Sequence, residues 1–293
     1  MRMRRLFITG AGGFLGWNLC RQLAGSWEVV GAVRSTPVDL DSVRSVALDL
    51  TDPARLRQVF REVRPEAVIH AAAASKPDHC QLHPSESARI NVDVPVLLAG
   101  LCADAGVPFV FTSSDLVFDG RNPPYREEDP VSPVSIYGEQ KAKAEAEILN
   151  RHPSAAVCRM ALMFGDGGPG GSSFLQPMVR AMRGGKALKL FVDEVRTPLG
   201  GRDAAIGLAL ALGRSSGLLH LGGVERISRY DLGRLIADVF GIGEAVLIPT
   251  RQDEVSTPAP RPPDVSLDSS KARGLGFRPK PLREALRELR VAA

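Results

Sequence analysis

The stretch TGAGGFLG at residues 9–16 decides the fold of this chain. It follows a short apolar run at residues 6–9, typical of a buried strand, and precedes an apolar segment at 17–24 that reads as a helix. Its glycines Gly10, Gly13 and Gly16 allow a tight turn, close approach of backbone amides to a phosphate, and close packing of helix on strand. The helix N-terminus adds positive potential. This order of elements predicts a dinucleotide-binding turn at the start of the chain.

Strand and helix signals alternate through the first half of the sequence. Further strands are predicted at 28–33, 46–48, 67–71 and 108–112, and further helices at 53–63 and 92–103. Strand-helix units joined by right-handed crossovers build a doubly wound parallel sheet with helices on both faces. The expected fold class is therefore α/β, with a Rossmann-like doubly wound parallel sheet.

The pattern loosens after about residue 160. Segment 165–173 is rich in glycine and segment 251–263 is rich in proline, whereas segment 202–212 is rich in alanine and leucine. We predict an NADP(H)-binding Rossmann domain over residues 1–160, rejoined by about 200–222. A smaller, discontinuous substrate-binding lobe is predicted over residues 161–199 and 223–293.

Composition excludes several classes of protein. The 293 residues carry 37 basic and 33 acidic side chains, scattered among one another, which argues against nucleic acid and favours a small anionic ligand. No apolar run is long enough to cross a membrane, and the basic start leads into only a short apolar stretch, so we expect a cytoplasmic location. The four cysteines are widely spaced, with no CxxC pair, and fit reduced thiols.

The end of the second predicted strand distinguishes between dinucleotides. It reads Gly31-Ala-Val-Arg34-Ser, and no carboxylate follows until Asp39. A carboxylate there would bind the ribose 2′-hydroxyl of NAD, whereas an arginine can accept the 2′-phosphate of NADP. Arg34 therefore favours NADP(H), with a solvated surface arginine as the alternative.

A phenol and an ammonium group lie one helical turn apart at Tyr137 and Lys141. A ketone that receives hydride needs a proton at its oxygen, and we expect Lys141 to lower the pKa of Tyr137 so that the phenol donates it. Ser114 follows the fifth predicted strand, at the edge of the sheet where such folds keep their chemistry, and is expected to orient the carbonyl. An exposed tyrosine and lysine on a surface helix are the alternative.

Other polar residues receive plainer interpretations. His79 and His83 flank Cys80, but zinc needs three or four ligands and no second pair is in evidence, so a surface loop or helix start is expected and no metal is assigned. His70 ends an apolar strand and is expected to be packed and hydrogen-bonded. No serine stands in a GxSxG motif, which argues against a hydrolase.

Longer segments resemble the extended branch of the short-chain dehydrogenase/reductase superfamily, and within it the dTDP-4-dehydrorhamnose reductase family, which includes the regulatory beta subunit of methionine adenosyltransferase. The resemblance covers almost the whole chain. It rests on SSDLVFDG at 113–120, YREEDP at 125–130, YG at 137–138 with Lys141, HAAA at 70–73, KPD at 76–78, NV at 91–92, RTP at 196–198, RD at 202–203, RP at 261–262 and LD at 267–268.

This resemblance implies an NADPH-dependent reductase of a nucleotide-linked 4-keto-6-deoxy sugar. It assigns catalysis to Ser114, Tyr137 and Lys141, with Tyr137 as the proton donor. The cofactor side then comprises Gly10, Gly12, Gly13, Phe14, Leu15, Gly16, Arg34, Asp49, Leu50, Ala71, Ala72, Ala73, Tyr137 and Lys141. The substrate side comprises Ser114, Asp115 and Arg261, with Arg261 near the phosphates.

Two positions depart from the family pattern. The family commonly has a tyrosine where this chain has Leu116, and an aromatic substrate contact where this chain has aliphatic residues around Leu162, which implies an altered sugar pocket. Two alternatives remain open: an NADP-binding regulatory subunit of another enzyme, and a sugar-nucleotide epimerase or dehydratase, against which Arg34 argues. The oligomeric state is open as well, a homodimer included.

Overall fold

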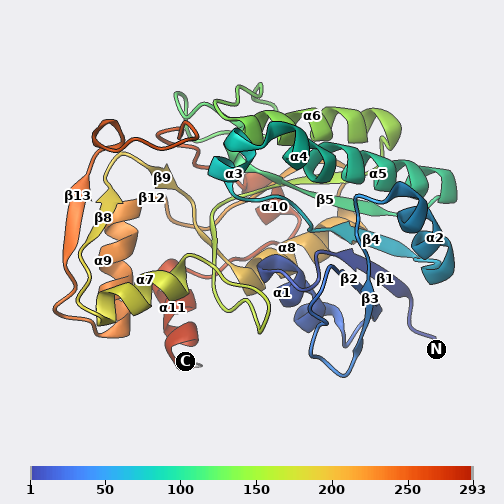
Figure 1. Ribbon diagram of the computed structural model, residues 1–293, viewed down its shortest axis with the longest axis horizontal. Coiled ribbons are helices and arrows are strands. Elements are labelled where there is room, and N and C mark those ends of the chain that lie inside the picture. Colours follow the sequence, from blue (N-terminus) through green and yellow to red (C-terminus); the bar gives the residue numbers. More distant parts are fainter. Residues whose placement is uncertain (1, 292–293) are drawn as a thin grey trace.

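The computed structural model describes residues 2–291 and is organised around one seven-stranded sheet (Figure 1). Strand β1 (Arg5–Thr9) lies near its middle, the strand order is β11-β6-β5-β4-β1-β2-β3, and all neighbouring strands are parallel. The other strands are β2 (Glu28–Val33), β3 (Val43–Ala47), β4 (Ala67–His70), β5 (Phe109–Ser114), β6 (Ala156–Met160) and β11 (Gly217–Leu221). This is the order of a doubly wound sheet, so the predicted fold class is confirmed.

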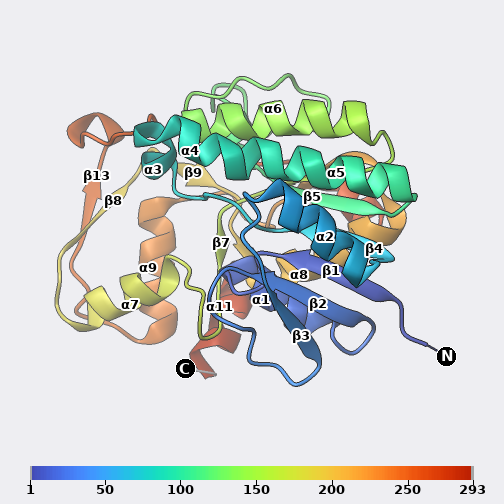
Figure 2. The same cartoon turned by 45° about the vertical axis from the view of Figure 1, so that its right-hand side comes forward.

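Helices cover both faces of this sheet (Figure 2). Because successive strand residues point to opposite faces, Leu6 and Ile8 enter one apolar core while Phe7 enters the other. The Leu6 side is covered by α1 (Phe14–Leu23) and α8 (Gly201–Arg214), and the Phe7 side by α2 (Pro53–Val63), α5 (Val94–Ala105) and α6 (Ile136–Arg151). The carboxyl ends of the parallel strands are thereby left as the edge where a ligand can enter.

Local signals set the limits of several helices. Asp52 caps α2, accepting hydrogen bonds from the backbone nitrogens of Ala54 and Arg55, and Pro53 takes the first helical position. The observed first helix begins at Phe14, directly after the glycine turn, and β3 begins three residues before the predicted strand. A π-helical turn at Arg89–Asp93 precedes α5, and sequence periodicity did not predict it.

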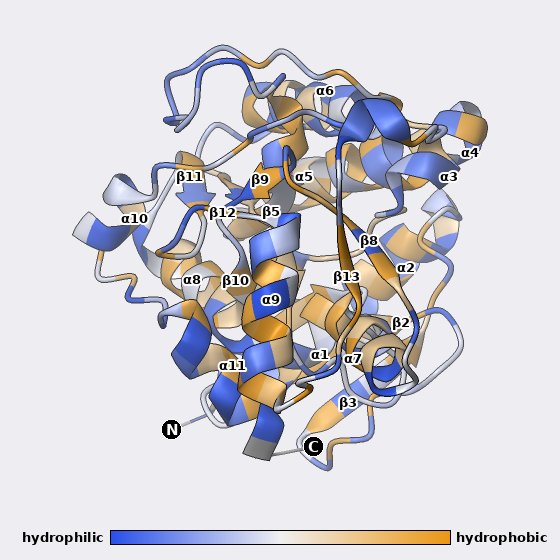
Figure 3. Cartoon of the chain, turned by 90° about the vertical axis from the view of Figure 1, so that its left-hand side faces the viewer, coloured by the Kyte–Doolittle hydropathy of each residue, from blue (hydrophilic) through white to orange (hydrophobic). Residues whose placement is uncertain are grey.

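A separate apolar core lies beyond one end of the sheet. It is formed mainly by α7 (Leu175–Arg183), β8 (Leu188–Phe191), α9 (Arg229–Phe240), β13 (Leu247–Thr250) and α11 (Leu282–Val291). Figure 3 faces this part, where α9 and α11 carry bands of both hydrophilic and hydrophobic residues. Such amphipathic helices bury one side and leave the other in water. Between β8 and α9, the chain returns to the large sheet through α8 and β11.

Short elements complete the fold around the strand ends. They are α3 (Pro77–Leu82), α4 (Pro84–Ala88), a 3-10 turn at Asp115–Val117, β7 (Met163–Phe164), β9 (Val195–Arg196), β10 (Leu199–Gly200), β12 (Ile227–Ser228), a 3-10 turn at Gln252–Glu254 and α10 (Ser270–Gly274). All four cysteines are free and buried. No helix within residues 2–291 is long and apolar enough to cross a bilayer.

Candidate functional site

The glycine turn between β1 and α1 forms one side of a cavity of about 860 Å³. Gly10 has a φ of 69°, a conformation that side chains rarely adopt, and its carbonyl accepts a hydrogen bond from Gly13 N at 2.9 Å. A Cβ atom at Gly16 would lie 2.0 Å from Gly10 O, so only glycine allows the helix to start this close to the strand. Phe14 and Leu15, the first residues of α1, also line the cavity. Their backbone amides have no partner within the helix and are suited to phosphate oxygens.

The structure brings together all residues that the sequence assigns to the cofactor. They come from the β1 turn, the ends of β2 and β4, the segment after β3, and α6. The cavity is lined by Gly10, Gly12, Gly13, Phe14, Leu15, Gly16, Arg34, Asp49, Leu50, Ala71, Ala72, Ala73, Tyr137 and Lys141. Its size, its glycine floor and its basic far end therefore fit a dinucleotide.

Several lining residues were missed by sequence reasoning. Lys76 belongs to the KPD motif of the family resemblance, His79 to the histidine pair to which no metal was assigned, and Arg89 to the π-helical turn. His79 lies 3.8 Å from Glu86, and its ring centroid is 4.8 Å from that of His83. No local pattern identifies these side chains, because their approach to the cavity depends on how α3 and the π-helical turn pack.

The glycine-rich segment 165–173 was predicted to belong to the substrate-binding lobe. In the structure it also lies against the glycine turn between β1 and α1. Gly170 and Ser172 line the cavity, and a Cβ at Gly171 would lie 2.6 Å from Phe14 N. The segment is tied to α1 by Asn18, whose amide donates to Asp166 O at 2.8 Å. Backbone without side chains can therefore cover the turn closely.

Tyr137 and Lys141 are both buried on α6, whose first turn is capped by Ser135. The Lys141 ammonium donates to Thr112 O at 2.9 Å and lies 4.6 Å from the centroid of the Phe111 ring. Burial lowers the pKa of Lys141 from its ordinary value to about 8, and the nearby Glu145 partly opposes this shift. The surface-helix alternative is wrong, since both side chains are buried.

The prediction that the Lys141 charge lowers the pKa of Tyr137 is wrong for the residues that surround Tyr137 in the structure. Burial raises the pKa of Tyr137 above its ordinary value, and the charge of Asp115 raises it further. A hydrogen bond with Ser114 lowers the pKa in part. The ammonium points to the Thr112 carbonyl and lies 5.9 Å from the centroid of the Tyr137 ring. Tyr137 is thus held as a neutral phenol at pH 7.

Ser114 lies beside the Tyr137 phenol. Its hydroxyl accepts from Leu116 N at 3.2 Å and donates to an Asp115 carboxylate oxygen at 3.1 Å. Burial raises the pKa of Asp115 to about 6, an effect that Arg196 opposes. Ser113, which was not singled out, lines the cavity, and its hydroxyl has no hydrogen-bond partner within residues 2–291.

His70 behaves as the packed histidine expected from the sequence. Its Nδ1 atom lies 2.7 Å from Thr9 Oγ1, and the side chain is fully buried. Burial, followed by the charge of Lys141, lowers the pKa of His70 to about 3, so the ring is neutral. It is therefore not a proton donor at neutral pH.

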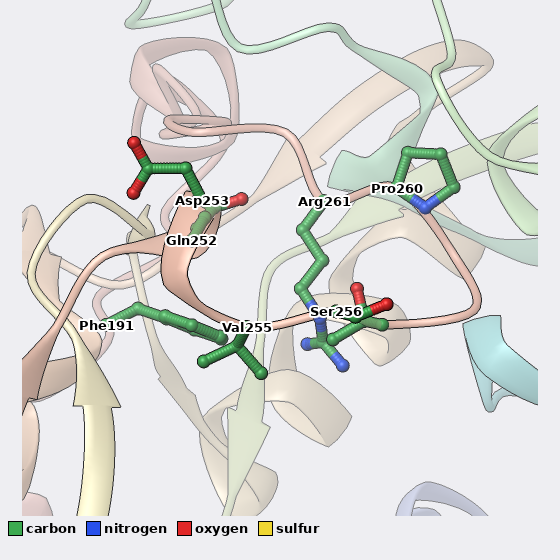
Figure 4. A pocket seen from close by; sticks show the side chains of 8 residues that line it. Phe191, Gln252, Asp253, Val255, Ser256, Pro260 and Arg261 are labelled. Carbon is green, nitrogen blue, oxygen red and sulfur yellow. The ribbon is translucent and has the colours of Figure 1, made fainter.

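Arg261 lies outside the dinucleotide cavity, in a second pocket of about 390 Å³ (Figure 4). Its guanidinium lies 5.9 Å from the centroid of the Phe191 ring, 3.7 Å from Asp78 and 3.6 Å from Glu194. The pocket is also lined by Gln252, Asp253, Val255, Ser256, Thr257 and Pro260. A cation over an aromatic ring beside polar groups can bind a flat, anionic ligand.

Glu194 connects this pocket to the strand edge. The buried carboxylate lies 3.6 Å from Arg196 and 3.9 Å from Arg229, in addition to its contact with Arg261. The charges of Arg196 and Glu194 in turn act on Asp115, next to Ser114. Among these three arginines, the guanidinium of Arg261 is the most exposed, so it is the one that a ligand phosphate can reach.

Comparison with known proteins identifies relatives along the full chain. The family model described as RmlD substrate binding domain matches residues 3–292. Methionine adenosyltransferase 2 subunit beta from Xenopus laevis is 30% identical over 296 residues, which cover 97% of this chain and 86% of that protein.

Solved structures show the same architecture. A dTDP-4-dehydrorhamnose reductase from Clostridium acetobutylicum superposes with a TM-score of 0.85 at 27% identity and covers 97% of this chain and 98% of its own. A dTDP-4-dehydrorhamnose reductase from Bacillus anthracis, solved in complex with NADP, superposes with a TM-score of 0.88 at 23% identity and full coverage of both chains.

Proposed function

The chain belongs to the RmlD substrate binding domain family, and from this premise we propose that it is an NADPH-dependent reductase of a nucleotide-linked 4-keto-6-deoxy sugar. The observation that carries the proposal is the buried pair Tyr137 and Lys141 in the wall of the cavity that begins at the glycine turn. A positioned phenol and a buried cation in a dinucleotide cavity are suited to carbonyl reduction. The reductases of similar structure support the same reaction class.

The cavity offers each part of the cofactor a partner. The backbone of Gly13, Phe14 and Leu15 would hold the pyrophosphate, Asp49 and Leu50 the adenosine, and Arg34 the 2′-phosphate. Ala71 to Ala73 would line the path to the nicotinamide, near Tyr137. When bound, NADPH supplies the hydride.

Three side chains at the carboxyl edge of the sheet act on the carbonyl group and the cofactor. Tyr137 is protonated at pH 7, since the ordinary pKa of a phenol is already about 10 and burial raises it further, and it donates this proton to the substrate oxygen. Lys141, whose ammonium is held at Thr112 O, would bind the cofactor ribose and keep the nicotinamide beside the phenol. Ser114 hydrogen-bonds the same oxygen and orients the carbonyl.

The second pocket supplies the substrate side of the proposal. Arg261 would bind the diphosphate of the substrate, and Phe191 offers an aromatic face to its base. Leu116 and Leu162 do not line the dinucleotide cavity and lie in apolar clusters on the substrate side. A pocket with aliphatic groups here would hold the sugar by shape rather than by ring stacking.

A direct test is NADPH oxidation by the purified protein across a panel of dTDP- and UDP-linked 4-keto-6-deoxy sugars, with NADH as the control. At least one of these sugars is expected to drive NADPH oxidation, with the keto group reduced to a hydroxyl. Conversion of dTDP- or UDP-glucose, which still carry their 4-hydroxyl, without net NADPH oxidation would indicate an epimerase or dehydratase instead.

A second function is favoured by the match to methionine adenosyltransferase 2 subunit beta. In that case the chain would bind NADP(H) and regulate another enzyme through its surface. Tight NADPH binding combined with no oxidation across the whole panel would support this regulatory function and contradict the reductase.

The buried lysine predicts the pH dependence of the reaction. Since burial lowers the pKa of Lys141 to about 8, its ammonium form predominates below that pH and is lost above it. We expect kcat/KM to be level below about pH 8 and to fall about tenfold per pH unit above it.

The matched variant for this profile is Lys141→Arg. A guanidinium stays protonated throughout this range, so the decline above pH 8 should disappear even if the variant is slower. A decline that persists unchanged in Lys141→Arg would assign the titration to another group.

A further inference from the structure

A second arginine faces the same end of the cavity as Arg34. Arg34 follows β2, and Arg89 begins the π-helical turn before α5, yet both side chains line the dinucleotide cavity. Hydrogen bonds from Thr51 lower the pKa of Asp49, and the charges of Arg34 and Arg89 lower it further, so both guanidiniums act on this one carboxylate of the cavity wall. Neither has a hydrogen bond or ion pair within residues 2–291. Two exposed arginines that converge without partners are available to an anionic ligand.

The backbone that carries Arg89 is held rigidly. Asn91, in the same π-helical turn, is fully buried. Its side-chain oxygen accepts from Ala74 N at 2.9 Å and its amide donates to Gln140 Oε1 at 2.9 Å. The turn is thus tied both to the cofactor wall and to the helix that carries Tyr137. Arg89 and its neighbour Ile90 therefore face the cavity from a fixed position.

Two carboxylates near this end do not cancel the positive charge. Asp49 is held by Thr51, whose backbone nitrogen and hydroxyl donate to Asp49 Oδ1 at 2.9 and 2.7 Å. Glu86 lies 3.8 Å from His79 and forms no ion pair with Arg89 in the part of the chain that the structure describes. With Lys76 also in the cavity wall, the region keeps an excess of basic groups that can face a phosphate.

We propose that Arg89 is a cofactor-specificity residue that, together with Arg34, binds the 2′-phosphate of NADP(H) from the opposite side. The inference rests on the proposed NADP(H) cofactor and goes beyond it, since the end of the second strand assigns only Arg34. A phosphate held between two guanidiniums accepts charge-assisted hydrogen bonds from both. The 2′-hydroxyl of NADH is neutral and lacks this attraction between opposite charges. Arg89 thus acts on the choice between the two dinucleotides.

The experiment is titration calorimetry of the full chain with NADPH and with NADH, which needs no sugar substrate. The wild-type protein is expected to bind NADPH more tightly. Arg89→Ala should weaken NADPH binding about tenfold and change NADH binding by less than about twofold. The double variant Arg34→Ala/Arg89→Ala should bind the two dinucleotides about equally.

The control is Arg61→Ala, which removes an exposed arginine from α2 that does not line the cavity. It should leave both affinities unchanged. If the wild type prefers NADPH and Arg89→Ala keeps that preference, the role of Arg89 is overturned and the proposed cofactor stands. Equal losses for NADPH and NADH would also overturn it, because they would reflect damage to the shared site. A wild type without any preference would overturn the role of Arg89 and the NADP(H) assignment together.

Discussion

Replacing Tyr137 by phenylalanine is expected to lower kcat about 10²- to 10⁴-fold. The ring is buried and its packing is kept, so the change removes only the hydroxyl that protonates the substrate oxygen. The affinity for NADPH should stay close to the parental value, because the glycine turn and the 2′-phosphate end are untouched. Steady-state NADPH oxidation with an accepted keto sugar, together with calorimetric NADPH binding, measures both effects.

Tyr230→Phe is the matched control for this variant. Tyr230 lies on α9, packs against the apolar core beyond the sheet, and does not line the dinucleotide cavity. This variant should turn over at the parental rate. If Tyr137→Phe reduces the ketone as fast as the control does, the proton donor is a different group and the assigned mechanism is wrong.

The change Gly16→Ala should damage the fold and the cofactor site at once. A Cβ at this position would lie 2.0 Å from Gly10 O and 2.6 Å from Gly10 C, and these backbone atoms can move only if the turn opens. Overpacking of this kind costs about 1–3 kcal/mol or more of the free energy of unfolding. Because the opened turn no longer places the Phe14 and Leu15 amides together, NADPH binding should be lost with it.

Gly25→Ala provides the comparison for this change. Gly25 is exposed, and a Cβ there would meet no atom within 4 Å. Urea unfolding followed by fluorescence, and NADPH titration of the folded protein, should show the parental values for Gly25→Ala. If Gly16→Ala keeps the parental stability and the parental NADPH affinity, the close approach of Gly16 to the Gly10 carbonyl is contradicted.

Much of the sheet domain was predictable from local sequence. The strand, glycine turn and helix at the N-terminus follow from apolar runs and glycine spacing, and α2 begins and ends at the predicted residues. The resemblance to the dTDP-4-dehydrorhamnose reductase family is confirmed by the family match. These predictions succeeded because periodicity and turn chemistry are properties of short segments.

The electrostatics of the site could not be predicted in the same way. A tyrosine and a lysine at i and i+4 suggested that the cation lowers the pKa of Tyr137, but the surrounding atoms bury both groups and direct the ammonium to Thr112. Arg261 stays a predicted contact of the substrate phosphates, but its place beside Phe191, in a pocket apart from the dinucleotide cavity, could not be predicted from the sequence. Burial and the direction of a side chain depend on residues distant in the chain.

The amino-acid order alone specifies the parallel sheet, its glycine turn and the helix that bears Tyr137 and Lys141, since each depends on neighbours within a few positions. Packing of distant segments decides that Arg89 lines the same cavity as Arg34, that segment 165–173 covers the turn, and that the pKa of Tyr137 is raised rather than lowered. The physical reason is that charge, solvent exclusion and close approach are set by distances in space, which no spacing along the chain encodes.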